Sequence, residues 1–110
     1  VMPHLVELIA WAECACFACA NDRYPALAAI VRAARILPLP DFAQALVDVP
    51  MPCGVGACEV CRTPTRAGEK HACIDGPEID SHIIDWDKFL PRFNLFKAQE
   101  AQSKARHGYA

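Results

Sequence analysis

Cysteine is the residue type in this chain with the most evident chemistry, because a thiolate binds soft metal ions, attacks electrophiles and forms disulfides. The seven cysteines form two groups, Cys14, Cys16 and Cys19 near the start and Cys53, Cys58, Cys61 and Cys73 in the second half. Their number is odd, and their density falls short of that in small secreted disulfide scaffolds. An odd, clustered set favours metal ligation over paired disulfides and predicts a reducing, cytoplasmic setting.

The second group has an informative, uneven spacing. The segment PCGVGACEVC, residues 52–61, contains C-x4-C-x2-C, and Cys73 follows after eleven further residues. Plant-type [2Fe–2S] proteins use this three-cysteine spacing and take a fourth cysteine from elsewhere in the chain. Two irons bridged by sulfide need four converging thiolates, and one wrapping loop and one returning strand can supply them. The spacing therefore favours a [2Fe–2S] site.

Other uses of the same sulfurs stay open at this point. A zinc-stabilised structural or interaction domain without redox activity is the main alternative, since four cysteines make a good zinc site. Zinc ribbons and fingers favour two short cysteine knuckles, however, and Cys73 has no partner knuckle. Disulfides and unligated buried cysteines are the remaining alternatives.

Two glycines lie inside the cysteine loop. Gly54 and Gly56 permit a positive φ or a close approach, so that backbone N–H groups can point at the sulfurs. A bulky side chain at either position would push the backbone away from a cluster. Gly54 and Gly56 also form the single Gly-x-Gly of the chain. Glu59 stands where a dinucleotide-binding fingerprint needs its third glycine, so the chain has no such fingerprint.

The first half of the chain is rich in alanine and predicts helices. Residues 3–20 are expected to form one largely enclosed helix, in which Cys14, Cys16 and Cys19 pack as small hydrophobes rather than binding a second metal. A second helix is expected over residues 24–37, before Pro38, and a third over residues 42–48 with Asp41 as its cap.

The second half predicts short strands and turns. The sequences CRTPT and KHACI flank a turn at residues 66–69 and indicate a β-hairpin. Aromatic residues follow and are expected to pack over residues 1–49, with a docking surface for a larger subunit as the alternative: Trp86, Phe89, Phe93 and Phe96. The expected fold is α+β, with a helical segment (1–49) packed on a small β-rich cluster-binding domain (50–97) and a flexible tail (98–110).

Charge and hydropathy bear on the partners. The chain has 11 Lys and Arg against 13 Asp and Glu, without a basic cluster, so nucleic acid is not the expected partner. The run LIAWAECACFACAND imitates a signal peptide, but it has no basic start, and Glu7 just before it and Glu13 within it interrupt the apolar segment. It is also shorter than the roughly 20 apolar residues that span a bilayer. We therefore expect no membrane insertion.

Residues 50–89 resemble a known family. PCGVGACEVC followed by HACIDGPEID is similar to the [2Fe–2S] domain of the electron-transfer subunit of class B dihydroorotate dehydrogenases. The continuation DGPEIDSHIIDWDKF looks even more like the small subunits of NADPH–ferredoxin transhydrogenases and sulfide dehydrogenases. In those subunits an aspartate can replace the first cysteine, whereas this chain has Cys53 there.

The resemblance implies a ligand set and a function. The ligands would be Cys53, Cys58, Cys61 and Cys73. The domain would be a non-catalytic electron-transfer part of an oxidoreductase complex, passing single electrons between an FAD, supplied by NAD(P)H, and a partner redox subunit. The FAD is expected in another domain or in a flavoprotein partner, because no FAD- or NAD-binding domain is recognisable in these 110 residues.

Overall fold

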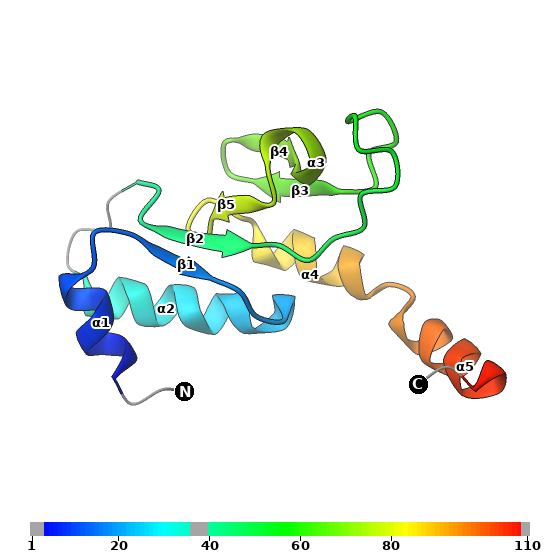
Figure 1. Ribbon diagram of the computed structural model, residues 1–110, viewed down its shortest axis with the longest axis horizontal. Coiled ribbons are helices and arrows are strands. Elements are labelled where there is room, and N and C mark those ends of the chain that lie inside the picture. Colours follow the sequence, from blue (N-terminus) through cyan, green and yellow to red (C-terminus); the bar gives the residue numbers. More distant parts are fainter. Residues whose placement is uncertain (1–3, 36–39, 109–110) are drawn as a thin grey trace.

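The computed structural model describes residues 4–35 and 40–108. Its main layer is a three-stranded sheet with the order β1 (Ala15–Phe17), β2 (Ala43–Leu46) and β5 (Glu78–Asp80). Strands β1 and β2 are parallel, whereas β5 is antiparallel to β2. A parallel pair needs a long crossover, and α2 (Tyr24–Ala34) supplies it after the short 3-10 turn η1 (Asn21–Arg23). Helices α1 (Leu5–Trp11) and α2 lie together below this sheet in Figure 1.

The second half is built on a hairpin. Strands β3 (Arg62–Thr65) and β4 (Gly68–His71) pair antiparallel, so the predicted hairpin is confirmed, but its turn takes only residues 66–67 instead of 66–69 and β4 ends before Ala72. The short helix α3 (Ala72–Asp75) follows β4 directly, and α4 (Trp86–Asn94) and α5 (Lys97–His107) complete the chain. Figure 1 shows the hairpin above the sheet and α5 extending away from the body. The predicted α+β class is confirmed.

Two helix predictions in the first half are wrong. The first helix ends at Trp11, and residues 15–17 form β1 instead of continuing it. Residues 43–46 form β2 where a third helix was expected, and Asp41 has a φ of +59° and caps no helix. In both strands burial alternates with a period of two, and pairing between the strands outweighs the helix propensity of alanine.

The second helix is confirmed over most of its predicted length. Helix α2 ends at Ala34, Arg35 is already extended, and residues 36–37 of the prediction lie outside the described residues. Pro25 stands in the first turn, where a missing N–H costs nothing. Val31 is fully buried, and the Arg35 guanidinium lies 4.1 Å from the centre of the Phe42 ring.

Tyr24 joins the first half of the chain to the second. Its hydroxyl oxygen lies 2.6 Å from the Leu46 carbonyl oxygen and 3.0 Å from that of Phe17, so it links the ends of β1 and β2. The Trp86 ring stacks on the Tyr24 ring with 5.3 Å between the centroids. This contact confirms that Trp86 packs over the first half. Phe89 extends the same core, whereas Phe96 is 62% exposed.

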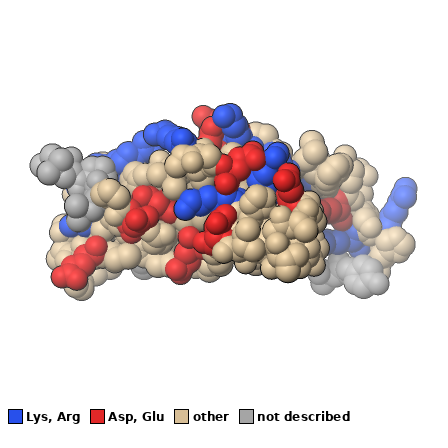
Figure 2. All heavy atoms as spheres, turned by 90° about the horizontal axis from the view of Figure 1, so that it is seen from above, with Lys and Arg blue, Asp and Glu red and all other residues tan. Residues whose placement is uncertain are grey.

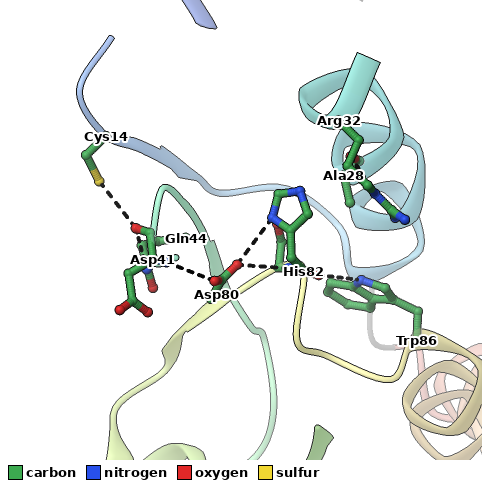
Figure 3. Close-up of polar contacts among 9 residues, drawn as sticks. Cys14, Ala28, Arg32, Asp41, Gln44, Asp80, His82 and Trp86 are labelled. Atoms are coloured by element: carbon green, nitrogen blue, oxygen red, sulfur yellow. Dashed lines mark hydrogen bonds and ion pairs between the residues drawn. The ribbon is translucent and has the colours of Figure 1, made fainter. Parts of the chain in front are cut away.

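Asp80 makes a second junction, shown in Figure 3. Its carboxylate is 7% exposed and accepts hydrogen bonds from the backbone N–H groups of Asp41 and His82, each at 2.9 Å. Nδ1 of the His82 ring lies 3.3 Å from the same carboxylate. The bonds hold the entry to β2 against the turn that follows β5. A buried carboxylate is costly without such partners, and these bonds offset the cost of enclosing this aspartate.

The C-terminal segment is helical but unburied. Helix α5 has no buried residue, and Gly108 ends it in the left-handed conformation with a φ of +69°. The segment expected to be a flexible tail thus contains a helix, and its flexibility stays a prediction. Acidic and basic side chains are interspersed over the face shown in Figure 2. None of the helices in the described parts of the chain is both long and apolar enough to cross a membrane.

Candidate metal centre

The cysteine loop has an irregular backbone that glycines make possible. After β2 the chain runs through residues 50–61 without a helix or strand, and Figure 1 shows this loop curling at the upper right. Gly54 and Gly56 have φ values of +67° and +72°, in the left-handed region that glycine adopts without cost. The expectation that these glycines permit positive φ is therefore met. Glu59 also has a positive φ, of +57°, and no sequence signal indicated it.

Cys61 and Cys73 form one sulfur pair. Their Sγ atoms lie 3.4 Å apart, and Cys61, directly before β3, is 1% exposed. Cys73 lies in the first turn of α3, so the prediction that a returning strand carries it is wrong by two residues. Pairing of the hairpin nevertheless brings the two cysteines together, because the Ala72 N–H donates to the Cys61 carbonyl across its open end at 3.3 Å.

Cys53 and Cys58 form the second pair. The Val55 N–H donates to the Cys53 sulfur at 3.5 Å. Further N–H groups, from Cys58 and Ala57, and the Cys58 thiol also face this sulfur. These donors favour the thiolate, and with that of Val55 the strongest they lower the pKa of Cys53 to about 6. The loop therefore stabilises negative charge on sulfur, which a metal-binding thiolate requires.

The two pairs are neighbours. The pKa of the Cys73 thiol is raised, mainly because partial burial removes water from its charged form and because the Cys61 thiol lies beside it. The Gly56 N–H acts in the opposite direction and so faces the Cys73 sulfur, and Cys53 is close enough for its charge to contribute. Among the described residues, no three His, Cys, Asp or Glu side chains converge tightly enough to hold a single metal ion.

The first cysteine group does not join this centre. Cys14, just before β1, and Cys16, within β1, are both exposed. The prediction that they pack inside a helix is therefore wrong. Sγ of Cys16 lies 3.3 Å from a carboxylate oxygen of Glu78, and this hydrogen bond is the main cause that raises the pKa of the thiol. Only Cys19 packs against the core.

Arg92 is a supporting residue that the sequence did not reveal. Its guanidinium donates to the backbone carbonyl oxygens of Glu59, at 2.9 Å, and Arg62, at 3.3 Å. It therefore attaches the end of the cysteine loop to α4. The contact spans about thirty residues of sequence, and an arginine on a helix surface gives no local signal for it.

We expect Gly56→Val to lower metal incorporation more than Gly54→Val does. Both changes force a left-handed backbone on a side chain that disfavours it, at a cost of roughly 1–2 kcal/mol. At Gly56 an added Cβ would also lie 2.8 Å from Cδ1 of Ile74, the end of an exposed side chain that would have to turn away, so the extra loss should be modest; at Gly54 it would meet nothing within 4 Å. The measurement is metal bound per chain after purification under one protocol.

The double variant Gly56→Val/Ile74→Ala is the control for this prediction. It removes the atom that the new side chain would meet, so it should recover part of the loss. Equal incorporation in the two single glycine variants would show that Ile74 does not confine the loop.

Comparison with known proteins agrees with this geometry. Residues 50–85 match the iron–sulfur cluster binding domain of dihydroorotate dehydrogenase B. The family resemblance expected from the cysteine loop is thereby confirmed. The matched segment of this chain begins just before Cys53, includes the hairpin and Cys73, and ends at Asp85, the cap of α4.

Two curated relatives are also similar to part of this chain. A dihydroorotate dehydrogenase B electron transfer subunit homolog from Thermotoga maritima is 40% identical over 53 residues, which are 48% of this chain and 19% of that protein. The dihydroorotate dehydrogenase B electron transfer subunit of Clostridium perfringens is 44% identical over 36 residues, 33% of this chain and 15% of that protein.

A solved structure is also similar. It is a chain from the structure of an NADH-dependent reduced ferredoxin-NADP oxidoreductase, described in connection with flavin-based electron bifurcation. The identity is 34% and the TM-score 0.50, and the match covers 59% of this chain and 24% of that one. The match to each curated relative covers less than a fifth of that relative's length.

Proposed function

We propose that residues 50–97 hold a [2Fe–2S] cluster through Cys53, Cys58, Cys61 and Cys73. The observation that carries this proposal is the approach of the Cys61 and Cys73 sulfurs, 3.4 Å apart at the open end of the hairpin, beside a loop that holds Cys53 and Cys58 and donates an N–H to the Cys53 sulfur. In such a cluster each iron takes two protein thiolates, so two pairs suit it. A mononuclear zinc site would instead need all four around one ion.

The backbone donors also fit an anionic iron–sulfur group. N–H groups of Val55 and Gly56 face the sulfurs of Cys53 and Cys73 respectively, and a positive φ at Gly54 and Gly56 allows the loop to turn inward. Hydrogen bonds to ligand sulfurs stabilise the reduced state and set its potential. This is the role we assign to the two glycines as cofactor-binding residues.

The function supported best is one-electron relay. A bound [2Fe–2S] cluster supplies reversible one-electron chemistry, and the chain's own residues hold the sulfurs, donate to them and limit water around Cys61. The relatives are named as electron transfer subunits of an NAD-dependent dehydrogenase. We infer that this chain is the non-catalytic electron-transfer part of a cytoplasmic oxidoreductase complex, between an FAD supplied by NAD(P)H and a partner redox subunit. The FAD would lie in another domain or in that flavoprotein partner.

Anaerobic purification followed by metal and sulfide analysis tests the proposal. We expect about two iron and two acid-labile sulfide per chain and a visible absorption band that dithionite bleaches. A colourless protein with one zinc per chain and no labile sulfide would instead support the zinc-stabilised interaction domain.

A further inference from the structure

We propose that a groove beside the cysteine loop is the docking site for an electron-transfer partner with an acidic surface. The groove has a volume of about 450 Å³. The buried Phe89 borders it, and the rest of its apolar lining comes from the approach to the loop, from the loop itself and from the C-terminal helices: Val49, Pro50, Val60, Phe93, Leu95 and Phe96. We call it the α4–α5 groove. That the partner is an electron-transfer protein rests on the proposed function; that its surface is acidic does not.

The groove is next to the proposed cluster ligands. Val60, which lines it, directly precedes Cys61, and Arg92, which also lines it, donates to the carbonyls of Glu59 and Arg62 on both sides of that cysteine. A protein seated in the groove would therefore touch the backbone that carries the ligands. An electron-transfer partner has to approach the cluster closely. A partner bound in the α4–α5 groove would lie next to the proposed ligands.

Exposed apolar side chains make the groove suitable for a protein partner. Leu95 and Phe96 are 64% and 62% exposed at the junction of α4 and α5, and Val60 is 47% exposed. Large exposed apolar residues that surround a hollow are typical of interaction sites, whereas scattered single ones are not. Aromatic residues, phenylalanine among them, are enriched in protein interfaces.

The charge of the groove selects the partner. Arg92 bonds only to backbone carbonyls and Lys97 lies over the Phe93 ring at 5.5 Å, and neither has a carboxylate within 4 Å among the described residues. The charge of Arg62, by contrast, is offset by Glu59 and Glu69. Glu100 is the one acidic residue in the lining. Carboxylates on a partner could form ion pairs with Arg92 and Lys97.

A second copy of this chain fits the groove poorly. Helix α5, the projecting element that a second copy would offer, carries Lys97, Lys104 and Arg106 against a single carboxylate, that of Glu100. Insertion of this helix would bring like charges together at the groove, which costs affinity. The chain as a whole has a net charge of −2, so attraction for an acidic partner has to come from this local surface rather than from the whole molecule.

Calorimetric titration of the full chain with an oxidised flavodoxin of acidic surface tests the proposal. Flavodoxin is used as a probe with a known flavin and a negative face, and basic cytochrome c is the control protein. We expect flavodoxin to bind at low ionic strength and to weaken as salt is added, because charge pairs at a rim are screened. Cytochrome c should bind more weakly.

Matched variants locate the binding. Lys97→Glu and Phe96→Ser should each raise the dissociation constant of flavodoxin about tenfold or more. Lys104→Glu makes the same charge change on the same helix outside the groove lining and should raise it no more than about twofold. All three positions are exposed, so folding should be retained.

Several outcomes would overturn the proposal. These are no flavodoxin binding at low ionic strength, equal effects of Lys97→Glu and Lys104→Glu, or a concentration-dependent dimer that Phe96→Ser abolishes, which would assign the groove to a second copy. The titration needs no electron transfer. A chain that contains zinc and no labile sulfide but still shows the variant pattern would refute the proposed function and leave the acidic docking site standing.

Discussion

Cys58→Ser purified anaerobically is expected to lose nearly all of its iron, its labile sulfide and its visible absorption. Serine is a poor ligand near neutral pH because its hydroxyl stays protonated, so one iron would lack a thiolate. Loss of an outer-shell partner alone already costs about 10- to 100-fold in metal affinity, and loss of a ligand should cost more. Cys58 also contributes an N–H and a thiol to the environment of Cys53, so the change disturbs both members of that sulfur pair.

Cys16→Ser is the matched control for this prediction. Cys16 is an exposed thiol on β1, bonded to Glu78 and outside the two sulfur pairs. Its substitution should leave iron, sulfide and the absorption spectrum at wild-type values. The ligand assignment would be wrong if Cys16→Ser bleached the protein or if Cys58→Ser kept its full iron content. Measurement of both variants from parallel preparations separates a lost ligand from oxidative damage during purification.

The cysteine loop was predictable from sequence because its chemistry depends on local spacing. Three cysteines and two glycines within ten residues restrict what the backbone can do, and the turn at residues 66–67 brings Cys73 back to Cys61. The hairpin and α2 were predictable for the same reason, since turn residues and a 3.6-residue period are local signals.

Long-range contacts decide the parts that the sequence did not reveal. The alanines of β1 and β2 favour a helix by intrinsic propensity, and only the pairing of Ala15 with Ala43 and of Phe17 with Ala45 selects the strand. Likewise, Arg92 supports the loop from a helix about thirty residues away. Neither feature has a periodicity or a motif that a single sequence could display.

The βαβ arrangement of the first half has a consequence for the centre. Because β2 leads directly into the cysteine loop and β5 follows α3, the sheet holds both ends of the segment that contains all four proposed ligands. The Val47 N–H donates to the Pro77 carbonyl at 2.9 Å, which closes this segment at its base. The core below the loop should therefore matter for the centre even though it supplies no ligand.

Phe89→Ala tests how much this core contributes to stability and should destabilise the fold strongly. Phe89 is 2% exposed, meets Trp86 edge-on with centroids 5.6 Å apart, and stacks on Phe93 at 5.9 Å. Removal of a buried phenylalanine ring costs about 3–5 kcal/mol, a large part of the roughly 5–15 kcal/mol that stabilises a domain. Thermal unfolding followed by circular dichroism, with both proteins in the same metal state, measures the effect.

Phe96→Ala provides the contrast, because the same ring is removed further along the chain from a position that is 62% exposed. Its effect on stability should stay within about 0.5 kcal/mol. A partner that uses the α4–α5 groove would nevertheless bind this variant less well, since Phe96 lines it. Equal melting temperatures for wild type and Phe89→Ala would mean that α4 is not part of the core. A loss of stability in Phe89→Ala but not in Phe96→Ala would separate the buried face of α4, which supports the core, from the exposed junction of α4 and α5, which is proposed to meet a partner.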